Sequence, residues 1–128
     1  MPVLKENNKR SFGKLGEDLA AEYLGKNGYK LLDRNYRSGR MGEIDIVAVQ
    51  GEYLCFIEVK TRTGKLFGLP CEAVDARKQA NLRKLAWAYM KHKGLEGKNA
   101  RFDVVEVTGN KKGDEFINIK INVLRNAF

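Results

Sequence analysis

The sequence predicts an α/β protein in which a mixed sheet is flanked by helices. Its 128 residues suit one domain, since two domains would each be too small to bury much surface. Helical and strand patterns alternate along the chain in the order helix, three strands, helix, two strands. A nearly continuous apolar run at 53–60 is typical of a strand covered on both faces, so this strand should be central.

The first half of the chain predicts one helix and three strands. Ser11 can cap a helix that runs to about residue 27, and Gly28 supplies its stop. Four apolar residues at helical spacing should face the core, namely Phe12, Leu15, Leu19 and Tyr23. Strands are expected at 29–36, 43–49 and 53–60.

The second half predicts a loop, one helix and two strands. Asp75 can cap the helix, and Gly94 follows its last turn. Its core face is expected to hold Leu82, Leu85, Ala86, Tyr89 and Met90, and Trp87 is assigned to the core as well. Strands are expected at 102–107 and 116–121, separated by a polar turn at 109–114. We interpret residues 1–10 as a flexible N-terminal segment and 11–128 as a single domain.

Composition excludes several classes of protein. A hydrophobic fraction of 43% and a charged fraction of 31% fit a folded chain and not a disordered one. No apolar run is long enough for a membrane span, and the basic N-terminus lacks the apolar segment of a secretory signal, so we expect a cytoplasmic protein without membrane association. Cys55, Cys71 and the single histidine, His92, do not match a zinc-ligand pattern.

The charge balance indicates a polyanionic partner. The net charge is +8, and the segment 60–93 holds nine Lys and Arg against two acids. An excess of this kind favours nucleic acid, with DNA expected ahead of RNA. Within or beside this segment we expect phosphate contacts from Arg62, Lys65, Lys78, Arg83 and Lys84. A solvated helix face is the alternative interpretation.

Charged residues inside two predicted strands indicate a site that binds a divalent cation. Glu58 and Lys60 share a face of their strand because side chains alternate, and Asp45 comes near Glu58 if the two strands pair through the turn at 50–52. Two carboxylates in an apolar setting repel unless a cation joins them. Mg²⁺ prefers such oxygen ligands, and it leaves coordination positions for phosphate and water. An ordinary salt bridge is the alternative for the Glu-x-Lys pattern alone.

Two further acids extend this candidate site. Glu17 has Gly13, Ala20 and Ala21 as its one-turn neighbours, so we expect it to face protein, although stabilisation of the helix dipole is an equal alternative. Glu43 shares the strand face of Asp45. It could ligate metal too, or hold Arg40 or Arg62 in place, and we rank it after Asp45 and Glu58.

The order αβββαβ with Glu17, Asp45 and Glu58-Val59-Lys60 resembles the restriction-endonuclease-like superfamily of nucleases. Further motifs, in order along residues 11–128, resemble the bacterial YraN family of small nuclease-like proteins: Gly16-Glu17, Arg34-Asn35, Gly42-Glu43-Ile44-Asp45, Glu58-Val59-Lys60-Thr61-Arg62, Gly68 with Pro70, Arg101-Phe102-Asp103-Val104-Val105 and Ala127-Phe128. One departure is Ile44, which occupies the position where many superfamily members have proline.

The resemblance implies catalytic roles for Glu17, Asp45, Glu58 and Lys60. Asp45 and Glu58 would hold Mg²⁺ or Mn²⁺, Lys60 would orient or activate water, and Glu17 would be an accessory acid as in Holliday-junction-resolving relatives. We therefore expect a metal-dependent nuclease that hydrolyses phosphodiester bonds in DNA, with branched or flapped DNA as candidate substrates. A resolvase-like role would require a homodimer. The alternative is a non-catalytic nucleic-acid-binding module on the same fold.

Overall fold

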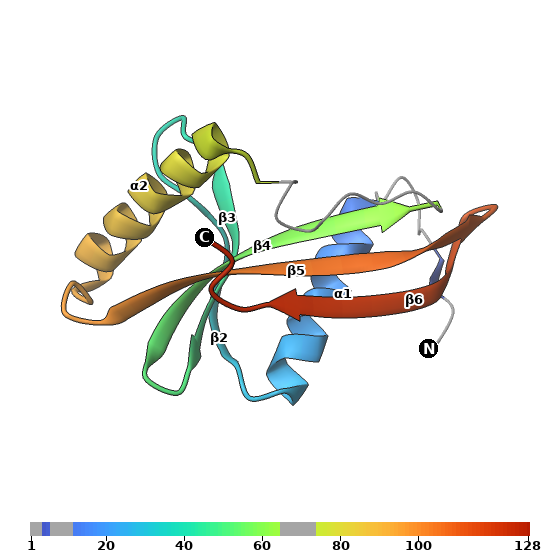
Figure 1. Ribbon diagram of the computed structural model, residues 1–128, viewed down its shortest axis with the longest axis horizontal. Helices are drawn as coiled ribbons and strands as arrows, with labels where there is room; N and C mark the ends of the chain where they lie inside the picture. Colours follow the sequence, from blue (N-terminus) through green and yellow to red (C-terminus); the bar gives the residue numbers. More distant parts are fainter. Residues whose placement is uncertain (1–3, 6–11, 65–73) are drawn as a thin grey trace.

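The computed structural model describes residues 4–5, 12–64 and 74–128, and these form a sheet with helices on both sides (Figure 1). The elements in chain order are β1 (Leu4–Lys5), α1 (Phe12–Lys26), β2 (Lys30–Arg37), β3 (Glu43–Gln50), β4 (Tyr53–Thr63), α2 (Ala76–Lys93), β5 (Asn99–Lys112) and β6 (Glu115–Leu124). Of the predicted N-terminal segment 1–10, only β1 is described. The predicted cap Ser11, the basic residue Lys65, the motif residues Gly68 and Pro70, and Cys71 lie outside the described residues.

The sheet has the strand order β1-β6-β5-β4-β3-β2. β4 is central, as its apolar run predicted, and it pairs parallel with β5 and antiparallel with β3. The remaining pairings are antiparallel, so the sheet is mixed. Together with the element order, this arrangement is consistent with the predicted restriction-endonuclease-like core.

Alternation along β4 divides the interior into two hydrophobic cores. Cys55 and Ile57 pack on the α1 side with Leu19, Ala20 and Leu24 of that helix. Leu54 and Phe56 pack on the α2 side, where Leu82, Leu85, Ala86, Tyr89 and Met90 cover the sheet. The core face predicted for α2 is therefore confirmed apart from Trp87. The two helices cover opposite faces, and both begin near the same end of β4 (Figure 1).

Two aromatic residues assigned to the core are exposed. Trp87 is 59% exposed, because the buried stripe of α2 occupies the opposite side of the helix at 100° per residue. Tyr23 is 37% exposed, because the buried stripe of α1 continues through Ala20 to Leu24. The predicted helix cap is confirmed, since the Asp75 carboxylate accepts a hydrogen bond from the Lys78 amide at 2.8 Å.

The β5–β6 hairpin is longer than the sequence predicted. The polar residues expected to form a turn continue the ladder, with Asn110, Lys111 and Lys112 pairing with Ile117, Phe116 and Glu115. Only Gly113 and Asp114 connect the strands. Gly109 lies inside β5, where a Cβ would come within 2.5 Å of the Phe116 ring, so close packing and not a turn requires glycine there. No helix in the described part of the chain is long and apolar enough to cross a membrane.

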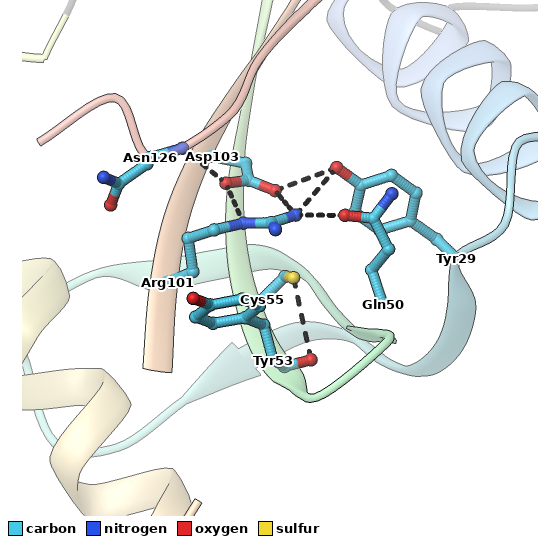
Figure 2. Close-up of polar contacts among 7 residues, drawn as sticks. All are labelled: Tyr29, Gln50, Tyr53, Cys55, Arg101, Asp103 and Asn126. Carbon is cyan, nitrogen blue, oxygen red and sulfur yellow. Dashed lines mark hydrogen bonds and ion pairs between the residues drawn. The ribbon is translucent and has the colours of Figure 1, made fainter. Parts of the chain in front are cut away.

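A buried polar network ties β5 to its surroundings on the α1 side (Figure 2). Arg101 donates two hydrogen bonds to Asp103, which is 0% exposed, and a third to Gln50. Tyr29 donates to Asp103 at 3.0 Å, and the Asn126 amide donates to the same carboxylate at 2.9 Å. The network joins β3, β5, the start of β2 and the C-terminal segment. We interpret the Arg101-Phe102-Asp103 motif as structural, because Asp103 has no access to solvent.

Candidate active site

A cavity of about 830 Å³ lies where the first turns of α1 and α2 approach β3 and β4. Its lining includes the acids Glu17, Glu43, Asp45 and Glu58 and the cations Lys14, Lys60, Arg77 and Lys78. The four residues predicted to be catalytic therefore share one cavity. Their catalytic roles stay a prediction.

Strand pairing places Asp45 beside Glu58. The β3–β4 ladder ends with Ile46 opposite Ile57, and Asp45 and Glu58 are the next residues beyond this pair. Asp45 Oδ2 accepts a hydrogen bond from the Val59 amide at 2.7 Å. Burial and the neighbouring Glu58 raise the pKa of Asp45 from 3.8 to about 8, against the opposing effect of the Val59 amide. The repulsion expected between these two carboxyl groups is therefore present in the fold.

Glu58 lies between two lysines. Its side chain is 3% exposed, and its Oε2 atom is 3.6 Å from Lys60 Nζ and closer still to Lys78 Nζ. Burial, together with the nearby Lys78 ammonium, lowers the pKa of Lys60 despite the charge of Glu58. At Lys78 the effect of burial is outweighed by Glu58, which raises its pKa.

The carboxylates of Glu17 and Glu43 converge on that of Asp45. One carboxylate oxygen from each of Glu17, Glu43 and Asp45 lies within 4.8 Å of the other two. Two oxygens bound to one Mg²⁺ at about 2.1 Å are at most about 4.2 Å apart, so small side-chain movements would let all three reach one ion. This acidic triad could bind a metal ion. Glu58 is not part of it, so the triad differs from the predicted ligand pair of Asp45 and Glu58.

Neighbouring side chains from β2 hold the triad together. Asn35 Nδ2 donates to Glu17 Oε1 at 2.9 Å and to Glu43 Oε1 at 3.4 Å. Arg34 Nη2 lies 3.5 Å from Glu17, and Arg37 donates to Glu43 at 2.9 Å. Glu43 therefore holds Arg37, and not Arg40 or Arg62 as the sequence suggested.

The contribution of Asn35 was not predicted from the sequence. The residue has φ of 54°, a left-handed conformation that Asn adopts more readily than most residues. An asparagine within a predicted strand is the one local signal that could have marked it. Its motif partner Arg34 forms a second ion pair with Asp18 at 2.7 Å, so both residues of that motif connect β2 to α1.

Close packing of α1 on β4 positions Glu17. A Cβ at Gly16 would lie 1.8 Å from Thr61 Oγ1, so only glycine lets the helix approach this closely. The side chain of Glu17 is 16% exposed, which confirms that it faces protein. The Gly16-Glu17 motif thus combines a packing residue with a cavity residue.

The cations predicted to contact phosphate occupy different settings. Lys78 lines the cavity, whereas Arg62 pairs with Glu106 at 3.6 Å. Arg83 lies over the rings of Phe102 and Phe128, at 5.2 and 5.5 Å from their centroids. Lys84 is exposed on α2, and Lys65 lies outside the described residues. Arg77 and Lys14, which were not among the predicted phosphate contacts, also line the cavity.

Comparison with known proteins identifies the family. The profile described as "Uncharacterised protein family UPF0102" matches residues 16–107, a span that contains Glu17, Glu43, Asp45 and Glu58. A UPF0102 protein of Acetivibrio thermocellus is 45% identical over 126 residues, covering 98% of this chain and 97% of that protein. A UPF0102 protein of Moorella thermoacetica is 52% identical over 99 residues, covering 77% of this chain and 82% of that protein. The chain therefore belongs to the UPF0102 family, the YraN family that its motifs resemble.

Proposed function

We propose that this protein is a metal-dependent nuclease that hydrolyses phosphodiester bonds in DNA. The observation that carries the proposal is the shared cavity, in which a triad of acids lies beside a buried Glu58 and a lysine of lowered pKa. Acids suited to a divalent cation and lysines suited to a phosphate are the two requirements of hydrolysis at a polyanion.

The proposed cofactor is Mg²⁺ or Mn²⁺. Carboxylate oxygens are the ligands that these hard cations prefer, and Glu17, Glu43 and Asp45 supply three of them within 4.8 Å of one another. A bound cation would supply Lewis acidity to a phosphoryl oxygen and lower the pKa of a water. The raised pKa of Asp45 fits this role, because a carboxyl that is costly to ionise alone is stabilised as a carboxylate by a cation.

The lysines act on the other half of the cavity. Lys60 is 28% exposed, so its ammonium can reach a phosphate oxygen or the attacking water while Glu58 limits its movement. Lys78 neutralises Glu58, and Arg77 beside it adds a cation to the cavity wall. Such a division would bring positive charge to a bound phosphate and negative charge to a bound cation.

The rival function is nucleic-acid binding without catalysis. The two ion pairs of Glu58 favour this alternative, because they neutralise a buried carboxylate without any metal. In that case the cavity would be a structural ion-pair network beneath a basic surface.

A nuclease that cuts both strands of a branched substrate would in addition act as a homodimer.

Cleavage of a defined DNA panel tests the proposal. Pure protein is incubated with single-stranded, duplex, flapped and four-way DNA in Mn²⁺, in Mg²⁺ and in EDTA. We expect cleavage of at least one substrate only with metal, and its loss in Asp45→Asn. The control is Glu52→Gln, because Glu52 is exposed in the turn at the opposite end of β3 and β4. No cleavage by the parent, or equal cleavage by Asp45→Asn, would contradict the proposal.

A further inference from the structure

Trp87 is the only tryptophan of the chain, and its side chain faces solvent. It is 59% exposed on α2, although the opposite face of the same helix is buried against the sheet. Indole carries a large apolar surface, so its exposure on a folded domain forgoes a substantial gain from burial. The exposed indole therefore offers an aromatic face on which a ligand can stack.

The residues around Trp87 are cationic. Its one-turn neighbours on the helix surface are Arg83 and Lys84 on the preceding turn and Lys91 on the following turn, and all three are exposed. The 18 residues of α2 include six Lys or Arg and no Asp or Glu. The cores of protein-binding interfaces are depleted in charged residues and in Lys especially, so this setting favours a polyanion over a protein.

One of these cations is held in place. The guanidinium of Arg83 lies over the Phe102 and Phe128 rings, which are stacked 5.2 Å apart. A cation restrained by two rings loses less conformational freedom when it binds a phosphate. An exposed indole next to a restrained guanidinium and two lysines matches a nucleotide, which combines an aromatic base with flanking phosphates.

The helix surface connects Trp87 to the cavity. Arg77 and Asn81 line the cavity, and Lys84 and Lys91 continue their row at helical spacing. Trp87 lies six residues beyond Asn81, which corresponds to about 9 Å along the helix axis and about 120° around it. A stacked strand rises about 3.4 Å per nucleotide, so about three nucleotides span the axial distance alone, and the path around the helix requires more.

We infer that Trp87 stacks on an unpaired base while Arg83, Lys84 and Lys91 bind the adjacent phosphates. A paired base is enclosed within the duplex stack, so only a single-stranded or splayed nucleotide can present its face to the indole. The inference rests on the proposed function and narrows its substrate to DNA with unpaired nucleotides at least about three positions from the scissile phosphate.

Tryptophan fluorescence tests the inference directly, because all tryptophan emission comes from Trp87. The full chain is titrated in EDTA with a twelve-nucleotide oligo(dT) and, separately, with a blunt twelve-base-pair duplex. We expect oligo(dT) to quench the emission and the duplex to bind with far less quenching. Emission that stays constant at saturating oligo(dT) would overturn the inference.

Substitution adds an independent readout. By anisotropy of labelled oligo(dT), Trp87→Ala should weaken binding about 5- to 150-fold, and Trp87→Phe should restore most of the affinity. Tyr23→Ala is the matched control, since Tyr23 is an exposed aromatic on the other helix and should leave affinity unchanged. Equal unfolding midpoints for Trp87→Ala and the parent would show that the fold is intact. Parental affinity in Trp87→Ala would overturn the inference.

Further outcomes separate this inference from the proposed function. Quenching by oligo(dT) in a protein that cuts none of the DNA panel would refute the nuclease and leave the binding surface standing. Cleavage by the parent together with unchanged binding by Trp87→Ala would refute the surface alone. The surface could instead bind a second copy of the chain. In that case the emission would change with protein concentration, and sedimentation would show a dimer that Trp87→Ala abolishes. This result would overturn the inference.

Discussion

Lys78, on the first turn of α2, forms an ion pair with Glu58 in the interior of β4. Lys60 lies 3.6 Å from the same carboxylate oxygen, so one buried carboxylate forms ion pairs with two ammonium groups. Burial and the neighbouring Lys78 lower the pKa of Lys60, whereas at Lys78 the closer contact with Glu58 outweighs burial and raises the pKa. The cavity therefore has a cationic half around the lysines and an acidic half at Glu17, Glu43 and Asp45.

Metal should bind the acidic half and stabilise the fold. Adding Mn²⁺ to the parent should raise the unfolding temperature with increasing concentration, because the ion binds only the folded site. Glu43→Gln and Asp45→Asn should each reduce this rise strongly, since each removes one of three candidate ligands. Thermal unfolding at several Mn²⁺ concentrations and calorimetric titration measure the effect.

The variant Glu58→Gln tests whether the metal ion is held by the acidic triad or by Asp45 and Glu58, the ligand pair that the sequence predicted. If the triad alone holds the ion, this variant should keep most of the Mn²⁺ affinity. A loss as large as that of Asp45→Asn would instead make Glu58 a ligand. Equal and weak binding in the parent and in Asp45→Asn would contradict the metal site altogether.

Lys60→Ala should separate catalysis from folding. Glu58 keeps Lys78 as a partner in this variant, so the free energy of unfolding should change by less than about 1 kcal/mol. Cleavage should fall about 100-fold or more, because the lost ammonium acts on charge that develops in the transition state. Urea unfolding and metal-dependent cleavage are measured on the same preparation.

A matched control for this variant is Lys26→Ala. Lys26 is 73% exposed at the end of α1 and pairs only with Glu22 among the described residues, so neither measurement should change. The structural-network alternative expects the reverse result for Lys60→Ala, with a loss of several kcal/mol in stability. A well-folded Lys60→Ala that cuts as fast as the parent would remove Lys60 from catalysis.

The stability of the metal-free protein should fall with rising pH through the titration of Asp45. Its folded-state pKa is raised from 3.8 to about 8, so the folded state holds this proton more tightly than the unfolded chain. The resulting advantage is complete at low pH and is lost as the pH rises towards 8. Asp45→Asn has no such carboxyl, so its stability relative to the parent should increase over this range.

Urea unfolding of both proteins between pH 4 and about 9, in EDTA, measures this difference. A stability difference that stays constant across the range would contradict the raised pKa. Repeating the series with Mn²⁺ should reduce the pH dependence, because a bound cation stabilises the ionised carboxylate.

Asp103→Asn should destabilise the fold without weakening metal binding. The substitution leaves Arg101, whose side chain is 11% exposed, without its charged partner, and such losses cost about 3–5 kcal/mol. The double variant Arg101→Met with Asp103→Leu should recover part of this loss, because it leaves no unpaired charge. Unfolding by urea and Mn²⁺ titration of the folded fraction measure the two effects. Parental stability in Asp103→Asn would contradict the structural role of the network.

The sequence by itself determined the order of the elements and the core of the candidate site. Alternation along β4 predicted that Glu58 and Lys60 share a face, and strand pairing predicted that Asp45 lies near Glu58. Both inferences needed only the two-residue period of a strand and a short turn, because neighbours along the chain become neighbours in the sheet. The cap at Asp75 followed equally from local chemistry.

Only the tertiary structure decided which further residues complete the cavity. Glu17, Asn35 and Lys78 reach it from α1, β2 and α2, and their meeting depends on how closely and at what rotation those elements pack on the sheet. The Gly16–Thr61 contact sets that distance for α1. The rotation of α2 about its axis also exposes Trp87. Helical periodicity alone did not determine which of the apolar residues of α2 form its buried stripe. Contacts between elements distant in sequence arise from packing, which local patterns do not encode.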